Sequence, residues 1–266
     1  MRHLFSRRSF LITTSMAWPT ARMSAFEQQG AGPSSAVADT YPMQAPAMVR
    51  EAVVASHGNV KRIKELVDAH PALARAAYDW GFGDWEDCLG AASHVGNRDI
   101  AEYLIAKGAR PTLFSATMLG QLETVKAFLA AQPGAQRIPG PHSIPLLAHA
   151  KAGGPAAAAV FSYLESLGDA DAPKTEPISD EEKAALVGAY VFGPGAADRI
   201  DITLDKGALM LQRQGMPFAR GLLHLGNREF HPAGAAAVRV RFANASGGAT
   251  LTVTDGDIVV TATRRS

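Results

Sequence analysis

The sequence predicts an α+β protein of several domains, in which an α-helical repeat stack precedes a small antiparallel β-barrel or curled sheet. Three observations lead to this prediction. Amphipathic helical segments, each led by a glycine, recur between residues 48 and 171. A polar, proline-bearing linker follows at 172–180, and from 181 to 266 the spacing of apolar residues falls to two. A chain of 266 residues with 47% hydrophobic content can bury the cores that these domains need.

The first 38 residues have the features of an export signal. Arg7 and Arg8 precede an apolar stretch at 10–18 that is too short, and too rich in Thr and Ser, to span a bilayer. These residues resemble the bacterial twin-arginine signal, whose S-R-R-x-F-L-K core the chain matches except for Ile12. The resemblance implies a signal peptide at 1–38, cleaved after Ala38 or alternatively after Ala25, and a periplasmic or secreted protein that is exported already folded.

Charge and cysteine content exclude several classes of protein. Lys and Arg number 26 against 25 Asp and Glu, a net charge of +1 that lacks the basic excess a nucleic acid partner demands. The single cysteine, Cys88, rules out an intramolecular disulfide and offers a zinc site at most one thiolate. No later apolar run reaches the roughly 18 residues of a transmembrane helix, so no membrane insertion is expected after signal cleavage.

After a linker at 39–47, residues 48–171 repeat a unit of helix, glycine turn and helix. Gly58, Gly96 and Gly120 each precede a segment with apolar residues three and four positions apart, and Gly153 precedes a fourth. A shorter helix-prone segment stands ahead of each glycine, at 49–56, 89–95, 113–119 and 146–152. Two short helices cannot bury their apolar face alone, so we expect the units to stack.

These units resemble the ankyrin repeat family. The match to its T-P-L-H-x-A-A and I-V-x-x-L-L-x-x-G-A patterns is best at 89–111, and the segment I-P-L-L-A-H-A at 144–150 fits the start of a repeat. The glycines lie 38, 24 and 33 residues apart, whereas the family holds close to 33. The resemblance implies about four repeats of irregular length, with a surface that holds a protein partner.

The longest of these steps contains an enlarged loop at 78–87, which carries two of the three tryptophans. Aromatic and acidic side chains on one loop are typical of interface hot spots. With one histidine of the next repeat, the candidate partner-binding residues are Tyr78, Trp80, Phe82, Asp84, Trp85, Glu86 and His94. The alternative is that the aromatic side chains fold back and cap the exposed edge of a short stack. The sequence leaves both roles open.

The last domain, 181–266, alternates apolar with polar or small residues in six to eight short segments separated by glycine-bearing turns. This pattern predicts a small antiparallel barrel or curled sheet. Its start, Leu186-Val187-Gly188-Ala189-Tyr190, resembles the L-x-G-x-Y start of small lipocalin-like barrels that follow bacterial export-targeted domains. In that family such a barrel packs on its neighbour or holds a small apolar ligand. The medium-sized aliphatic residues here favour a filled interior.

No catalytic motif occurs in its required context, so we expect no catalytic residue, no metal and no cofactor. Six histidines could in principle take part in catalysis or metal binding: His57, His94, His142, His149, His224 and His231. Stacking of neighbouring repeats could bring His57 and His94 close together, but polar turn positions in helical repeats commonly carry histidine.

The sequence therefore predicts an exported, non-catalytic binding protein that uses an ankyrin-type surface to hold a protein partner in the periplasm. Neither that partner nor the oligomeric state can be named from the sequence. The alternative is a small apolar ligand bound in the β domain, which requires a cavity of about 300 Å³ or more. An enzyme with a histidine and carboxylate site has the least support.

Overall fold

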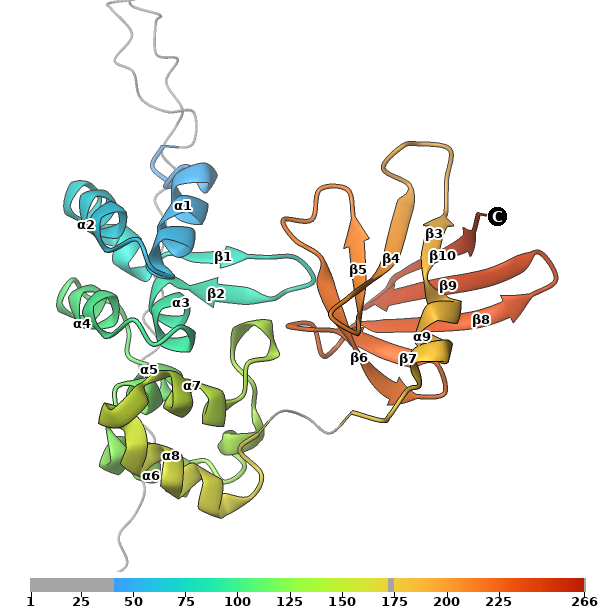
Figure 1. Cartoon of the computed structure of the whole chain (residues 1–266). Coiled ribbons are helices and arrows are strands. Elements are labelled where there is room, and N and C mark those ends of the chain that lie inside the picture. Colours follow the sequence, from blue (N-terminus) through green and yellow to red (C-terminus); the bar gives the residue numbers. More distant parts are fainter. Residues whose placement is uncertain (1–40, 172–174, 266) are drawn as a thin grey trace, which may run out of the picture. The chain divides into compact units, whose positions relative to one another are not determined.

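The computed structural model describes residues 41–171 and 175–265 (Figure 1). It is a mixed structure of paired helices followed by a closed antiparallel β-barrel of eight strands. The expected signal peptide and both of its cleavage points lie outside the described residues. In the part of the chain that is described, no helix has the length and apolar character needed to cross a membrane.

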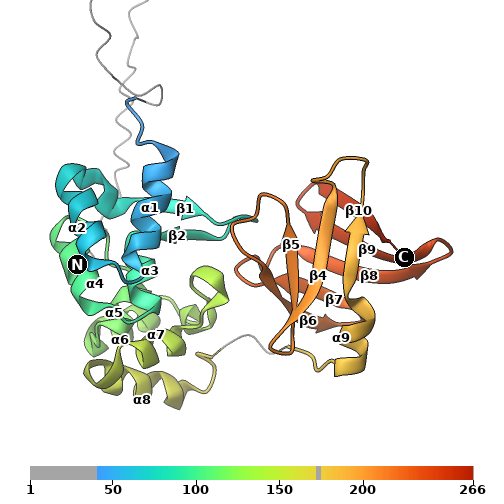
Figure 2. The same ribbon diagram turned by 45° about the horizontal axis from the view of Figure 1, so that its top comes forward.

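Helices of the N-terminal half come in pairs joined by short turns, and in both views the members of a pair lie side by side (Figures 1 and 2). The first helices of successive pairs also contact one another, α1 with α3, α3 with α5, and α5 with α7. The pairs are α1 (Pro46–Ser56) with α2 (Val60–Ala69), α3 (Cys88–His94) with α4 (Arg98–Ala106), α5 (Leu113–Met118) with α6 (Leu122–Ala131), and α7 (Leu146–Ala152) with α8 (Ala158–Leu167). Short 3₁₀ helices accompany them: η1 (Pro71–Arg75), η2 (Ala135–Arg137), η3 (Pro141–Ser143) and η4 (Gly154–Ala157).

Side-chain caps explain where α2 and α4 begin. The side chain of Asn59 accepts a hydrogen bond from the backbone N–H of Arg62, and Asn97 accepts one from Ile100 in the same way. Each asparagine follows a repeat glycine, so Gly58-Asn59 and Gly96-Asn97 each form both the turn and the cap. Apolar side chains of the paired helices form two buried clusters, one around α1 to α4 and one around α5 to α8.

The segment expected to be an enlarged loop is an antiparallel hairpin of β1 (Ala77–Asp79) and β2 (Trp85–Asp87). Tyr78 pairs with Glu86 in its register. At the tip, Gly81, Phe82 and Gly83 all have positive φ, which the two glycines adopt without strain. Three consecutive left-handed residues allow the chain to reverse tightly between the two short strands.

The barrel begins after α9 (Asp180–Leu186), whose N-terminus carries a capping box of Ser179 and Glu182. Strand β10 pairs with both β9 and β3, and this pairing closes the sheet. The rings of Tyr190 and Phe230 each contact that of Phe242, and these three side chains fill part of the interior. The strands are β3 (Gly188–Val191), β4 (Arg199–Asp205), β5 (Ala208–Arg213), β6 (Arg220–Gly226), β7 (Glu229–Pro232), β8 (Arg239–Ala245), β9 (Gly248–Asp255) and β10 (Ile258–Arg264).

Candidate functional site

Most of the predicted partner-binding residues are not on the free surface. Trp80, Asp84 and Glu86 are 5%, 3% and 0% exposed, because the hairpin packs against other parts of the same chain. Three others are half-buried: Tyr78, Phe82 and His94. Only Trp85 remains freely accessible, with 63% of its surface exposed. The three buried side chains are therefore not available to a protein partner in this conformation, and a partner-binding role for Trp85 stays a prediction.

Asp84, near the hairpin tip, lies at a contact of three chain segments. Its carboxylate forms a buried ion pair with Arg220 of β6 and accepts hydrogen bonds from the backbone N–H of His142 (2.9 Å) and from His142 Nδ1 (2.6 Å). Burial opposes ionisation of Asp84, but the hydrogen bonds from His142 and Arg220 outweigh it and hold the pKa of the carboxyl below its usual value. Asp84 is therefore a structural anion in this fold.

Glu86, on β2, lies at the centre of a cluster of three histidines. Its Oε1 lies 2.9 Å from His94 Nε2 and 3.5 Å from His57 Nε2, and its Oε2 lies 3.4 Å from His142 Nε2. The indole N–H of Trp80 donates to Oε2 at 2.8 Å. Burial alone would raise the pKa of Glu86, but these histidine hydrogen bonds lower it far below its usual value.

The repeat arrangement explains two members of the cluster. His57 follows α1 and His94 ends α3, so they stand one and two residues before the turn glycines of neighbouring pairs, and their ring centroids lie 4.9 Å apart. The expectation that stacking could bring these two together is confirmed. His142 comes from η3 with a φ of 59°, and neither spacing nor motif indicated that it would join them. The hydrogen bonds to Asp84 and Glu86 outweigh the burial of His142 and raise its pKa to about 9.

His57, Glu86, His94 and His142 could together hold a metal ion, since each offers one ligand atom and these atoms all lie within 4.8 Å of one another. The other three histidines named from the sequence lie outside this group. The Nδ1 of His149 lies 3.0 Å from the carbonyl of Pro145, His224 approaches the carbonyls of 176 and 177, and His231 is buried in β7. None of the three belongs to the metal-ligating group found among the described residues.

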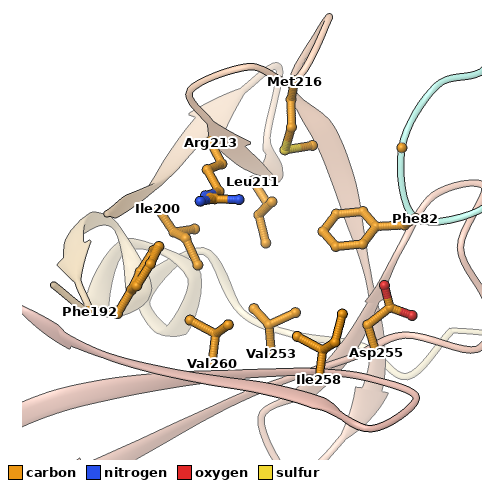
Figure 3. A pocket seen from close by; sticks show the side chains of 11 residues that line it. Phe82, Phe192, Ile200, Leu211, Arg213, Met216, Val253, Asp255, Ile258 and Val260 are labelled. Atoms are coloured by element: carbon orange, nitrogen blue, oxygen red, sulfur yellow. The ribbon is translucent and has the colours of Figure 1, made fainter. Parts of the chain in front are cut away.

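A second candidate site is a cavity of about 290 Å³ within the barrel. Its lining is mostly apolar, as the side chains in Figure 3 show. The lining residues belong to β4, β5, β9 and β10, to two loops and to the hairpin tip. Two charged residues, Arg213 and Asp255, also line it, and the Arg213 guanidinium lies 5.3 Å from the ring centre of Phe192. The expected filled interior is thus found around Tyr190 and not throughout the barrel. The lining residues are Gly81, Phe82, Phe192, Ile200, Leu211, Arg213, Met216, Val253, Asp255, Ile258 and Val260.

The hairpin therefore contributes to both sites, with Glu86 in the histidine cluster and Phe82 at the barrel cavity. Comparison of the chain with protein-family models, with curated proteins and with solved structures finds no match.

Proposed function

We propose that this chain is a binding protein whose barrel holds a small, mostly apolar molecule. The observation that carries the proposal is the cavity of about 290 Å³, which is close to the lower limit of roughly 300 Å³ for ligand pockets. The side chains of Leu211, Val253 and Ile200 point into it from three strands, and Phe82 approaches from the hairpin tip (Figure 3). Removing an apolar surface of matching size from water would provide the main driving force for binding.

The two charged residues indicate what else the ligand carries. An Arg guanidinium presents several N–H donors and no acceptor, so Arg213 favours a ligand with a carboxylate or carbonyl oxygen. Asp255, on β9, can accept a hydrogen bond from a hydroxyl or amine on the same molecule. We therefore assign the pocket to a small aliphatic or monocyclic compound with an oxygen at one end.

The test compares octanoate with octanol, which share an alkyl chain and differ in the charged oxygen. Because a ligand that binds only the folded state raises its stability, both should raise the melting temperature, octanoate more than octanol. Val260→Phe fills the cavity and should abolish both shifts. Val259→Phe is the matched control, since Val259 precedes it on the same strand, is 61% exposed and does not line the cavity.

The Arg213→Met variant tests the polar end of the pocket separately. It should reduce the preference for octanoate while leaving the octanol shift unchanged. Equal shifts in the wild type and in Val260→Phe would mean that these compounds bind elsewhere, and the absence of any shift in the wild type would reject the proposed ligand class.

The proposal includes export and a non-catalytic role. Support for a twin-arginine signal at 1–38 comes from the paired arginines and the apolar stretch after them. Support for an ankyrin-type stack comes from the order of the paired helices and from the contacts between the first helices of successive pairs. On this basis the protein acts in the periplasm or outside the cell.

A second candidate function, holding a protein partner, is favoured by the exposure of Trp85. A tryptophan with 63% of its surface exposed offers the kind of side chain that dominates interface hot spots. Trp85→Ala should abolish capture of a specific partner from periplasmic extract, while Phe128→Ala, which removes another exposed aromatic side chain, should not. Equal retention by both variants would exclude Trp85 from partner binding.

A further inference from the structure

The ring nitrogens of three histidines converge on one buried carboxylate, an arrangement that the barrel cavity does not explain. His57, His94 and His142 all direct Nε2 at the carboxylate of Glu86, which is fully buried. They come from the end of α1, the end of α3 and η3, while Glu86 comes from β2. We propose that these four residues form a structural binding site for one divalent metal ion of the zinc class. The proposal departs from the sequence expectation that no metal is bound.

The distances between the ligand atoms fit a tetrahedral ion. Zinc bonds to histidine nitrogen and carboxylate oxygen are about 2.0–2.1 Å long, which places neighbouring ligand atoms about 3.3 Å apart at the corners of a tetrahedron. The three histidine Nε2 atoms lie 2.9, 3.5 and 3.4 Å from the nearest oxygen of Glu86. The four ligand atoms all lie within 4.8 Å of one another, so the widest pair must close by at most about 1.5 Å to hold one ion.

Hydrogen bonds at Nδ1 orient the rings of two of the histidines, so that Nε2 faces Glu86. His57 Nδ1 lies 3.1 Å from the carbonyl oxygen of Val53, and His142 Nδ1 lies 2.6 Å from the carboxylate of Asp84. These oxygens only accept, so each Nδ1 carries a proton, and an ion would bind at Nε2 by displacing the proton held there. Metal-ligating histidines characteristically have such a carbonyl or carboxylate behind them.

Glu86 is also held in place, because Trp80 Nε1 donates to its Oε2 at 2.8 Å. The surroundings favour a cation as well: Asp84 and Glu86 are both buried carboxylates, whereas Arg220 supplies a single buried positive charge beside Asp84. In the metal-free chain His142 pairs with both carboxylates, and a divalent ion that displaces its Nε2 proton would take over the compensation of Glu86. Imidazole and carboxylate are ligands that zinc accepts, and four protein ligands complete its tetrahedron, as in structural sites.

The site would link consecutive parts of the repeat region. An ion bound there would tie α1, α3, the hairpin and η3 together, and Asp84 would connect the same hairpin to β6 through Arg220. Metal binding should therefore stabilise the folded chain without requiring any catalytic step.

The experiment uses the full chain, stripped of metal by a chelator and titrated with Zn²⁺ in a calorimeter. We expect one ion per chain and a rise in melting temperature on binding. Co²⁺ serves as a spectroscopic probe, because a tetrahedral site of nitrogen and oxygen ligands gives strong visible absorption that an octahedral aqueous ion lacks.

The variants separate this site from adventitious binding. Loss of a residue that only hydrogen-bonds to a metal ligand weakens metal binding by roughly 10- to 100-fold. His57→Ala and Glu86→Gln each remove a ligand itself, so each should weaken Zn²⁺ binding by more than this. The matched control is His70→Ala, since His70 is exposed and outside the cluster. Circular dichroism of each metal-free variant shows whether it folds, and His57 is the safest position because its side chain is 32% exposed.

Two results would overturn the proposal. One is a folded wild-type chain that binds no Zn²⁺, which would show that Glu86 is compensated by protonated histidine alone. The other is Zn²⁺ binding that is unchanged in His57→Ala and Glu86→Gln, or that is lost in His70→Ala, which would place the ion on surface histidines. Neither result bears on the barrel cavity, so this proposal and the proposed function can fail separately.

Discussion

Asp84 and Arg220 form a buried ion pair between residues 136 positions apart in the sequence, and each of the two is about 2% exposed at its side chain. Asp84 belongs to the hairpin tip and Arg220 begins β6, so the pair joins the repeat region to the barrel. A pair of charges removed from water is held by its attraction and by its other hydrogen bonds. Arg220 also donates to the carbonyl of Ala233 at 3.0 Å.

Arg220→Met should destabilise the chain by about 3–5 kcal/mol, because it leaves Asp84 as a buried charge without its arginine partner. Urea unfolding followed by circular dichroism measures this change. In the double variant Asp84→Asn/Arg220→Met the loss should be smaller than the sum of the two single losses, by about 0.5–3 kcal/mol.

Arg241→Met is the matched control for this pair. Arg241 pairs with Glu229 on the barrel surface, and its side chain is 68% exposed, so its removal should change stability by less than about 1 kcal/mol. Equal effects of the two arginine variants would show that the Asp84–Arg220 pair is solvated in solution.

The two hairpin tryptophans should respond differently to truncation. Trp80 is 5% exposed, contacts the ring of Tyr78 and donates to Glu86, so Trp80→Ala should cost about 3–5 kcal/mol of unfolding free energy. Trp85→Ala removes an exposed side chain and should change stability by no more than about 0.5 kcal/mol. Thermal and urea unfolding of both variants measure the difference. A large loss in Trp85→Ala would mean that Trp85 is covered in solution.

The sequence predicts those elements that are determined by residues close to one another in the chain. Turn glycines with asparagine caps, such as Gly58-Asn59, determine where α2 and α4 begin. Alternation with period two indicated the strands. Of the two forms that the sequence predicted, a barrel or a curled sheet, the structure has the closed barrel. These signals act over a few residues, so a single sequence shows them directly.

What the sequence could not provide are contacts made across long separations. Arg220 stands at the start of a strand like many exposed arginines, and nothing near it indicates that Asp84 is its partner. His142 joins His57 and His94 through a backbone of positive φ in η3 that its neighbours do not predict. The loop at 78–87 was expected at a surface, but its tip lines the barrel cavity through Phe82. Tertiary packing decides each of these cases.

Two turn glycines with similar backbone differ in their surroundings, and this difference tests how closely the helix pairs approach. Gly96 has a φ of 75° and Gly108 a φ of 94°, so alanine is strained at either position. A Cβ at Gly108 would meet nothing within 4 Å, whereas one at Gly96 would collide with the carbonyl of Ala152 at the end of α7.

Gly108→Ala should therefore cost only the backbone strain, about 1–2 kcal/mol. Gly96→Ala should cost about 1–3 kcal/mol more, because the turn after α3 must move away from α7. Urea unfolding of the two variants in one buffer gives the comparison. Equal losses would show that the two segments are further apart in solution.

His149 should make the stability of the chain depend on pH in a defined window. Its side chain is fully buried, Nδ1 bonds to the carbonyl of Pro145, and Nε2 has no partner among the described residues. Burial lowers its pKa to about 4, although the hydrogen bond to the carbonyl of Pro145 acts in the opposite direction. An unfolded chain has a histidine pKa of about 6.5, so between these two values the unfolded state binds more protons.

His149 therefore leaves the free energy of unfolding unchanged above about pH 6.5. As the pH falls toward 4 it lowers that free energy, by about 3 kcal/mol at most. His149→Leu removes the titrating group and the unpaired Nε2, so the variant should be at least as stable as the wild type at pH 7.5 and clearly more stable at pH 5. Urea unfolding of both chains across this range isolates His149, because the other histidines titrate in both. Parallel pH profiles would show that His149 is protonated, or reaches water, in the folded chain.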